Sequence, residues 1–249
     1  MSFDTKARIA RAKSTRRGLT LIELIVVLVI LVGLGGLLVP TISNALSRTH
    51  VSTCATTFPE VHQMMQRVLI ETFDLGDSFD SAIDTGAAGA GVNGQSVLTL
   101  NADDVAALAA AGITNVVDHD ATAADFNITF NIGATPRALA VGGELITLTP
   151  AQAAQIYLPS AATDRYVWLG IGRSWTRLGD LAPEPPTHFG DTNGVLPDQA
   201  YSRFGIILQV ADVDGPFEVA EFKRVSYSLD GTNFETGDNH IEVYWEDVQ

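Results

Sequence analysis

A single glutamate inside a long apolar run is the residue of this sequence whose chemistry most needs an explanation. Glu23 lies five residues after Gly18, within the run Leu19–Val39, which otherwise holds almost only apolar residues and glycines. A carboxylate in a membrane-spanning helix costs about 2.5–3.5 kcal/mol on insertion scales, so an ionisable group there is by default a functional one. We therefore expect Glu23 to have a charged partner.

The apolar run has the length and the flanking charges of a membrane span. Its 21 residues make a helix of roughly 31 Å, close to the thickness of a bilayer's hydrocarbon core. Six basic residues precede Gly18, which predicts a cytoplasmic N-terminus and an exported body: Lys6, Arg8, Arg11, Lys13, Arg16 and Arg17. A cleaved secretory signal is one alternative, with Ser43–Ala45 as a cleavage site, but the run exceeds the usual length of about 7–15 residues. A plain single-span anchor is a second alternative. It would still bear the free-energy cost of inserting the Glu23 carboxylate, but it would give that residue no function.

The string "RRG" followed by "LTLIELIVVLVILVGL" resembles the N-terminus of type IV pilins and of the pseudopilins of type II secretion systems. The resemblance covers roughly residues 14–72. It implies that a prepilin peptidase cuts after Gly18, that Leu19 is then methylated, and that Glu23 acts in assembly. Leu19 departs from the family's usual phenylalanine. Pro40 matches a position where the family often has proline, and Pro59 lies one residue from another, so both are expected helix kinks.

The chemistry of the cut end explains why a carboxylate would be retained at Glu23. A protonated amine at Leu19 and an ionised Glu23 are both poor solutes in lipid, and each is compensated if it pairs with its counterpart on a neighbouring subunit. Removing one partner leaves the other buried and unpaired, at about 3–5 kcal/mol. We expect this pair to set the register between subunits.

The chain is expected to have four segments and an α+β fold. They are a prepilin leader (1–18), the transmembrane half of a long helix (19–39), its amphipathic half (40–75) and an α+β globular body (76–249). Apolar residues recur at helical spacing in the amphipathic half and predict one buried stripe: Phe58, Val61, Met65, Val68, Leu69 and Thr72. The resemblance implies that this half packs on an antiparallel β-sheet with short helical inserts.

Local patterns place the elements of the body. Residues 76–96 read as an irregular connection because they contain many small residues and no strong period. Asn101 and the pair Thr149–Pro150 predict the starts of two short helices. Alternating apolar residues predict strands at 96–100, 126–132, 144–148, 165–171, 202–211, 222–229 and 241–246, with a turn at Asp230–Gly231. Trp168, Trp175 and Trp245 are expected in the core or half-buried in the sheet.

The sequence carries no catalytic motif, so we expect no enzyme, no catalytic residue and no cofactor. Asp118–Asp120 are interpreted as a solvated loop rather than as metal ligands. Two acidic turns contain closely spaced oxygen ligands of the kind that calcium prefers, but neither fits the EF-hand pattern: Asp212, Asp214 and Glu218 in the first, and Asp230, Asn233, Glu235 and Asp238 in the second. No metal ligand is assigned, and calcium at these turns stays open.

Charge and cysteine content limit the partners. The formal net charge is −14, and the part beyond Gly18 carries −19, which disfavours nucleic acid. With Cys54 as its single cysteine, the chain cannot form the C-terminal disulfide loop common in major pilins.

Two classes of function remain. The favoured one is a structural subunit of a pilus or pseudopilus, with a type II secretion pseudopilin preferred, anchored by one span in the inner membrane. Its partners would be other pilin-like subunits, the prepilin peptidase and an inner-membrane assembly platform. The alternative is a single-span anchored ligand-binding domain that uses a pilin-type export segment.

Overall fold

The computed structural model describes residues 20–86, 90–91, 95–120, 122–123, 133–186, 203–228 and 234–235. Within them, the side chains of residues 37–55, 90, 227–228 and 234–235 are not described. The strands expected at 126–132 and 241–246, the turn at Asp230–Gly231 and Trp245 lie outside these residues. The chain divides into two compact units, residues 1–46 and 47–249.

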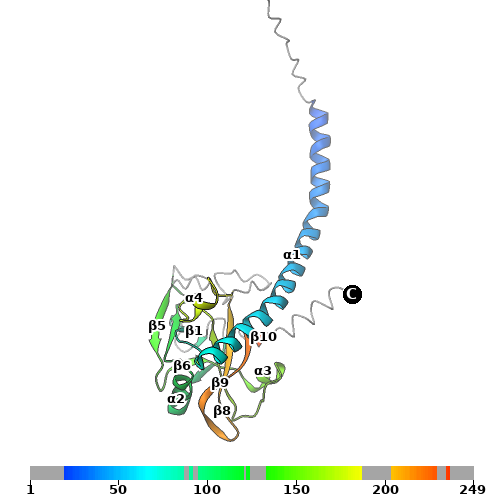
Figure 1. The fold of residues 1–249 in the computed structure, drawn as a ribbon. Helices are drawn as coiled ribbons and strands as arrows, with labels where there is room; N and C mark the ends of the chain where they lie inside the picture. The colour runs from blue at the N-terminus through cyan, green and yellow to red at the C-terminus, as the bar shows by residue number, and fades with distance from the viewer. Residues whose placement is uncertain are drawn as a thin grey trace, which may run out of the picture. The chain divides into compact units, whose positions relative to one another are not determined.

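Helix α1 (Leu21–Thr72) contributes to both units and packs its second half on the sheet (Figure 1). Four members of the predicted stripe, Phe58, Val61, Met65 and Val68, are at most 4 % exposed. Each large apolar side chain buried in this way stabilises the fold by about 1.5–3 kcal/mol. Leu69 is partly buried, but Thr72 is exposed, so its place in the predicted stripe was wrong. Thr72 instead donates its hydroxyl to the carbonyl of Val68, 2.8 Å away, at the last turn of the helix.

The body is a mixed sheet covered by helices, which confirms the α+β class. In the described residues ten strands join one sheet in the order β10-β9-β8-β7-β1-β4-β5, with β2 beside β1, and with β6 pairing both β3 and β7. The strands are β1 (Phe79–Asp84), β2 (Ala90–Gly91), β3 (Val97–Thr99), β4 (Asn115–His119), β5 (Ala134–Ala138), β6 (Glu144–Ile146), β7 (Arg165–Gly170), β8 (Phe204–Asp212), β9 (Gly215–Ser228) and β10 (Phe234–Glu235).

The prediction of an antiparallel sheet was wrong at one pair of strands. β1 and β4 run parallel, with Phe79 opposite Val116 and Asp80 opposite Val117. The chain between them contains β2, β3 and helix α2 (Ala102–Ala110), and a crossover of that length is what a parallel pair requires. The other described pairs are antiparallel.

Successive residues of the central strands face opposite sides of the sheet and enter two separate cores. Phe204, Ile206, Leu208 and Val210 of β8 pack with the α1 stripe, and the rings of Phe58 and Phe204 meet edge to face with centroids 4.9 Å apart. On the other side, residues of β7 and β8 pack against helix α3 (Pro150–Gln155) and its C-cap: Tyr166, Trp168, Ile207, Ala153 and Ile156. Trp168 and Trp175 are buried, as predicted. The central strands are therefore covered on both faces.

Two of the short helices begin where the sequence predicts. Asn101 caps α2 by accepting from the Asp104 N–H (2.8 Å), and the Asp104 carboxylate accepts from the Asn101 N–H (2.9 Å). Thr149 and Gln152 make the same reciprocal cap at α3, with Pro150 in its first turn. Helix α4 (Leu178–Leu181) is a single turn, and Leu178 is buried in the core with the α1 stripe.

Two local predictions were wrong. Residues 76–96 are not an irregular connection throughout, because they contain β1, whose six residues are all buried, and β2. Asp118 and His119 do not lie in a solvated loop: they are 5 % and 0 % exposed within β4. In both places polar residues are buried because the neighbouring strand supplies partners for them.

Candidate assembly site

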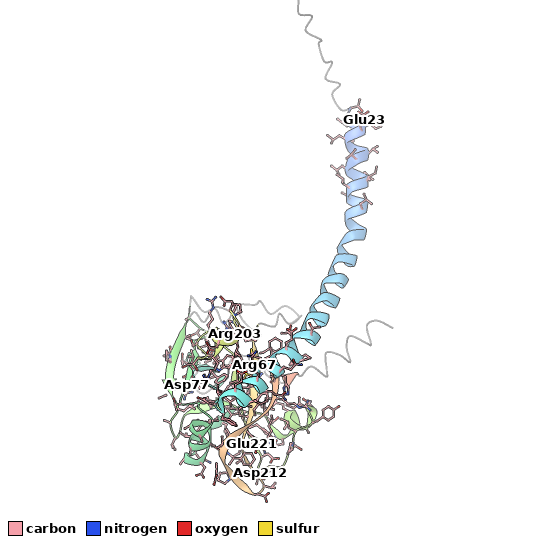
Figure 2. The ribbon with its side chains drawn as sticks, viewed as in Figure 1. Glu23, Arg67, Asp77, Arg203, Asp212 and Glu221 are labelled. Carbon is pink, nitrogen blue, oxygen red and sulfur yellow. The ribbon has the colours of Figure 1, made fainter. Side chains whose placement is uncertain are left out.

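Glu23 lies in the first turn of α1 (Figure 2). There it contacts Thr20. The Thr20 N–H donates to Oε2 of Glu23 over 2.8 Å, and the Glu23 N–H donates to Oγ1 of Thr20 over 3.4 Å. The two residues form a reciprocal helix cap, which satisfies two N–H groups that a helix start would otherwise leave without an intrahelical acceptor. The carboxylate of Glu23 therefore points back toward the N-terminal end of the helix.

Apart from Glu23, the part of α1 from Leu21 to Leu34 is apolar on every side. Large apolar residues from Leu21 to Leu34 are 50–78 % exposed in the structure: Leu21, Ile22, Leu24, Ile25, Val26, Val27, Leu28, Val29, Ile30, Leu31, Val32 and Leu34. A helix that is apolar all round needs an apolar environment supplied by something else. Among the residues that the structure describes, no helix has both the length and the apolar character needed to cross a membrane.

The remaining predicted site residues lie as follows. Gly18 and Leu19 fall outside the described residues. Pro40 and Pro59 both lie inside α1, and the kinks expected there remain predictions. Thr20 was missed as the partner of Glu23, although the sequence carries the signal: a threonine three residues before a glutamate at the start of an apolar run is a capping box.

A second group of polar residues is buried between β1, β4 and β5. Arg137 donates from Nε to Oδ2 of Asp118 over 2.6 Å, and the Ser81 hydroxyl donates to Oδ1 of Asp118 over 2.5 Å. Asp80 and His119 are both fully buried, with Oδ1 and Nε2 3.6 Å apart. Asp80 and His119 are shielded from solvent, Arg137 is partly exposed, and the contacts of this group link three strands.

Asp77, in the connection between α1 and β1, is joined to the start of β4 by four hydrogen bonds. Its Oδ1 accepts from the N–H groups of Thr114 (2.9 Å) and Asn115 (2.7 Å), and its Oδ2 accepts from the side chains of the same two residues (2.9 and 2.7 Å). Burial acts to raise the pKa of Asp77, but the hydrogen bonds from Asn115, Thr114 and Ser78 outweigh it, so that the pKa lies below its ordinary value.

An acidic cavity of about 470 Å³ opens beside the β8–β9 hairpin, with Asp164, Asp212 and Glu221 in its lining (Figure 2 labels the last two). Glu221 is paired with Lys223 over 2.6 Å.

The buried hydroxyl of Tyr166 donates to the Pro159 carbonyl over 2.9 Å. Burial, followed by the charges of Asp164 and Asp212, raises the pKa of Tyr166 to about 12.

The candidate calcium turns gain no support from the described residues. No group of three His, Cys, Asp or Glu side chains among them is placed to hold a metal ion. In the first turn, Oδ1 of Asp212 accepts from the Asp214 N–H over 2.8 Å, which closes the hairpin. Of the second turn, Asp230, Asn233 and Asp238 lie outside the described residues.

Comparison with known proteins bears on the N-terminal segment. Residues 13–38 match the family model of the prokaryotic N-terminal methylation motif. Searches against curated proteins and solved structures found no match for the chain. The match contains Gly18, Leu19, Thr20 and Glu23, which are the residues of the candidate site and of the expected cut. The chain is thus identified as carrying the N-terminal methylation motif that is typical of type IV pilins and pseudopilins.

Proposed function

We propose that this protein is a structural subunit of a membrane-anchored pilus or pseudopilus, and that it works in a type II secretion system. A prepilin peptidase cuts the leader after Gly18 and Leu19 is methylated. The segment Leu19–Val39 spans the inner membrane with the acidic body exported. The observation that carries the proposal is the methylation motif over residues 13–38, with Glu23 held at the first turn of a helix whose beginning, Leu21 to Leu34, is otherwise apolar.

Electrostatics explain how Glu23 selects its partner. In an apolar environment an ionised carboxylate is costly unless a cation compensates it, and the amine that cleavage frees at Leu19 of a neighbour is such a cation. The contact with Thr20 holds the carboxylate at the N-terminal end of the helix, where a neighbour's terminus can approach it. A slip of one residue between neighbouring helices breaks the pair, so the pair fixes their register.

The rest of the chain supports a structural subunit that carries out no chemistry of its own. The part beyond Gly18 carries a charge of −19, which keeps an exported body soluble and disfavours nucleic acid as a partner. Its single cysteine favours a pseudopilin over a major pilin with a C-terminal disulfide. The partners are then other pilin-like subunits, the prepilin peptidase and an inner-membrane assembly platform.

Replacing Glu23 tests the proposal. Glu23→Gln keeps the shape and removes the charge, and Glu23→Val also removes the hydrogen bond from Thr20. We expect both variants to insert into the membrane and to lose the leader, while little or none of either enters filaments sheared from cells. Glu218→Gln, which neutralises an exposed glutamate of β9, is the matched control and should assemble normally. Normal incorporation of both Glu23 variants would contradict the proposal.

A further inference from the structure

The cavity beside the β8–β9 hairpin has an acidic wall whose charge is only partly balanced by its own cation. Its volume is about 470 Å³, and its charged lining consists of Asp164, Asp212, Glu221 and Lys223. Glu221 and Lys223 form an ion pair over 2.6 Å, so the negative charge that remains belongs to the two aspartates. Both aspartates are half-buried. We call this space the hairpin cavity.

Hydrogen bonds hold the two aspartates in place but bring no cation to them. Oδ2 of Asp164 accepts from the Ala161 N–H over 2.7 Å, and Oδ1 of Asp212 accepts from the Asp214 N–H over 2.8 Å. Within the part of the chain that the structure describes, neither carboxylate forms an ion pair with a lysine or arginine. Their charges, after burial, raise the pKa of Tyr166 to about 12, so their field reaches beyond the cavity wall.

The lysines and arginines of the body do not supply the missing cation. Every lysine and arginine beyond residue 86 lies among the described residues, and of these Lys223 alone lines the hairpin cavity. Arg165 follows Asp164 in the sequence, but its Nε donates to Oδ1 of Asp104 over 3.1 Å instead. A lysine or arginine side chain that balances the two aspartates would therefore come from another molecule.

A buried glutamine adds a hydrogen-bond acceptor to the same wall. Gln209 lines the cavity and is 2 % exposed, and its Nε2 donates to Oδ1 of Asp164 over 3.3 Å and to the Ala211 carbonyl over 3.2 Å. Because both of these oxygens only accept, the amide has one possible orientation, with Oε1 turned away from them. No described residue donates to Oε1, although a buried acceptor normally has a donor. The wall therefore favours a ligand that carries both N–H donors and positive charge.

An arginine side chain fits these groups better than a metal ion or a lysine does. Among the described residues no group of three His, Cys, Asp or Glu side chains is placed to hold a metal ion. A guanidinium has five N–H donors in a planar fork, so it can donate to two carboxylates and an amide oxygen at once, whereas an ammonium is a compact point charge. Phe217 also lines the cavity, and guanidinium groups pack on aromatic rings. The volume of the cavity is in the range of ligand pockets.

We propose that the hairpin cavity binds an arginine side chain that a partner protein presents. The guanidinium donates to the carboxylates of Asp164 and Asp212 and to Oε1 of Gln209, and it balances the charge of the wall. The source is a residue within a polypeptide rather than free arginine, because the acidic wall repels the α-carboxylate of the free amino acid. This site goes beyond the proposed function, since its binding does not depend on whether the chain forms filaments.

Isothermal titration of the full-length, detergent-solubilised chain tests the site, with N-acetyl-arginine amide as the probe. We expect the probe to bind at least about tenfold more tightly than N-acetyl-citrulline amide, which has a similar shape and no charge. Free arginine should bind more weakly than the probe, and binding of the probe should weaken as the salt concentration rises. Equal affinities for the arginine and citrulline amides, or no binding of either, would overturn the proposal. Free arginine that binds as tightly as the probe would overturn the polypeptide source.

Neutral variants of the two aspartates locate the binding. Asp212→Asn keeps an oxygen that can accept from the Asp214 N–H and removes the charge, so the affinity for the probe should fall about tenfold. Asp164→Asn is a second variant with the same expected result, which keeps the test decisive if one of the two chains does not fold. Asp214→Asn is the matched control, because it removes the same charge from an exposed residue outside the cavity lining, and it should bind as wild type does. Wild-type affinity in the folded Asp212→Asn or Asp164→Asn chain, or an equal loss in the control, contradicts the site.

Discussion

Thr20 and Glu23 cap the first turn of α1 reciprocally, each accepting the backbone N–H of the other. The cap does two things at once, since it stabilises the start of the helix and it fixes where the carboxylate of Glu23 points. A neighbour's free amine would meet a carboxylate that is already oriented, so less conformational entropy is lost when the pair forms.

Removing the hydroxyl of Thr20 should weaken assembly without abolishing it. Thr20→Val keeps the shape of the side chain but removes the acceptor for the Glu23 N–H, a change that costs a helix start about 1 kcal/mol. We expect leader cleavage to continue and filament yield to fall between that of wild type and that of Glu23→Gln. Because both changes act on one contact, the double variant should match Glu23→Gln alone. Filament yields that multiply as independent effects would show that Thr20 acts elsewhere.

Asp77→Asn should destabilise the body in a pH-dependent way. The amide nitrogen that replaces Oδ2 faces two donors, from Thr114 and Asn115, so we expect a loss of about 1–2 kcal/mol in the free energy of unfolding at neutral pH. The pKa of Asp77 is lower in the folded chain than its ordinary value of 3.8. Its contribution is therefore present above about pH 4 and is lost as the pH falls below that value.

Urea unfolding of the detergent-solubilised chain at several pH values measures this effect. The difference between wild type and Asp77→Asn should shrink as the pH falls below about 4. Asp214→Asn, at the exposed tip of the β8–β9 hairpin, serves as control and should change little at any pH. An Asp77→Asn variant as stable as wild type at neutral pH would refute the role given to the four hydrogen bonds.

Tyr166 should make the body sensitive to alkali. Its pKa is raised from 10 to about 12 by burial and by the charges of Asp164 and Asp212. The unfolded chain releases this proton first, so the stability that Tyr166 contributes is present below about pH 10 and is lost as the pH rises toward 12. Tyr166→Phe should lose about 1 kcal/mol at neutral pH, with the bond to the Pro159 carbonyl, and should show a shallower loss of stability above pH 10. Identical alkaline unfolding curves would contradict this.

Gly205 should tolerate no side chain, because a Cβ there would lie 2.3 Å from ring atoms of Trp168. Trp168 cannot easily yield, since it is fully buried and its indole N–H donates to the Ser226 hydroxyl over 2.9 Å. We expect Gly205→Ala to lower the free energy of unfolding by about 1–3 kcal/mol. Gly179→Ala in α4, where a Cβ has open space, is the control. Equal thermal midpoints for the two variants would contradict the packing described here.

Elements set by local chemistry could be predicted from the sequence. Asn101 and Thr149 carry side chains that cap a helix start, so α2 and α3 begin where expected. The stripe of Phe58, Val61, Met65 and Val68 follows from helical spacing. Glu23 stood out because a carboxylate is costly in an apolar run.

Elements set by distant partners could not be predicted. β1 has the sequence "FDSAID", and the polar residues Asp80 and Ser81 in it argue against a buried strand. The structure shows that they are buried because His119 lies beside Asp80 and Asp118 accepts from the Ser81 hydroxyl. The parallel pairing of β1 with β4 depends on the chain folding back over more than thirty residues, for which local patterns carry no signal. β5 contains Pro136, which weakens a strand prediction but is tolerated at the edge of a sheet, and β5 ends the strand order within the part of the chain that the structure describes.

Mass spectrometry of the native protein, purified from membranes, tests the central claim most directly. The account predicts a mature chain that begins at Leu19 and carries one methyl group on its terminal amine, because only that cut creates the cation that Glu23 pairs with. A chain that retains Met1, or one that begins near Leu46 after cleavage at Ser43–Ala45, would contradict it.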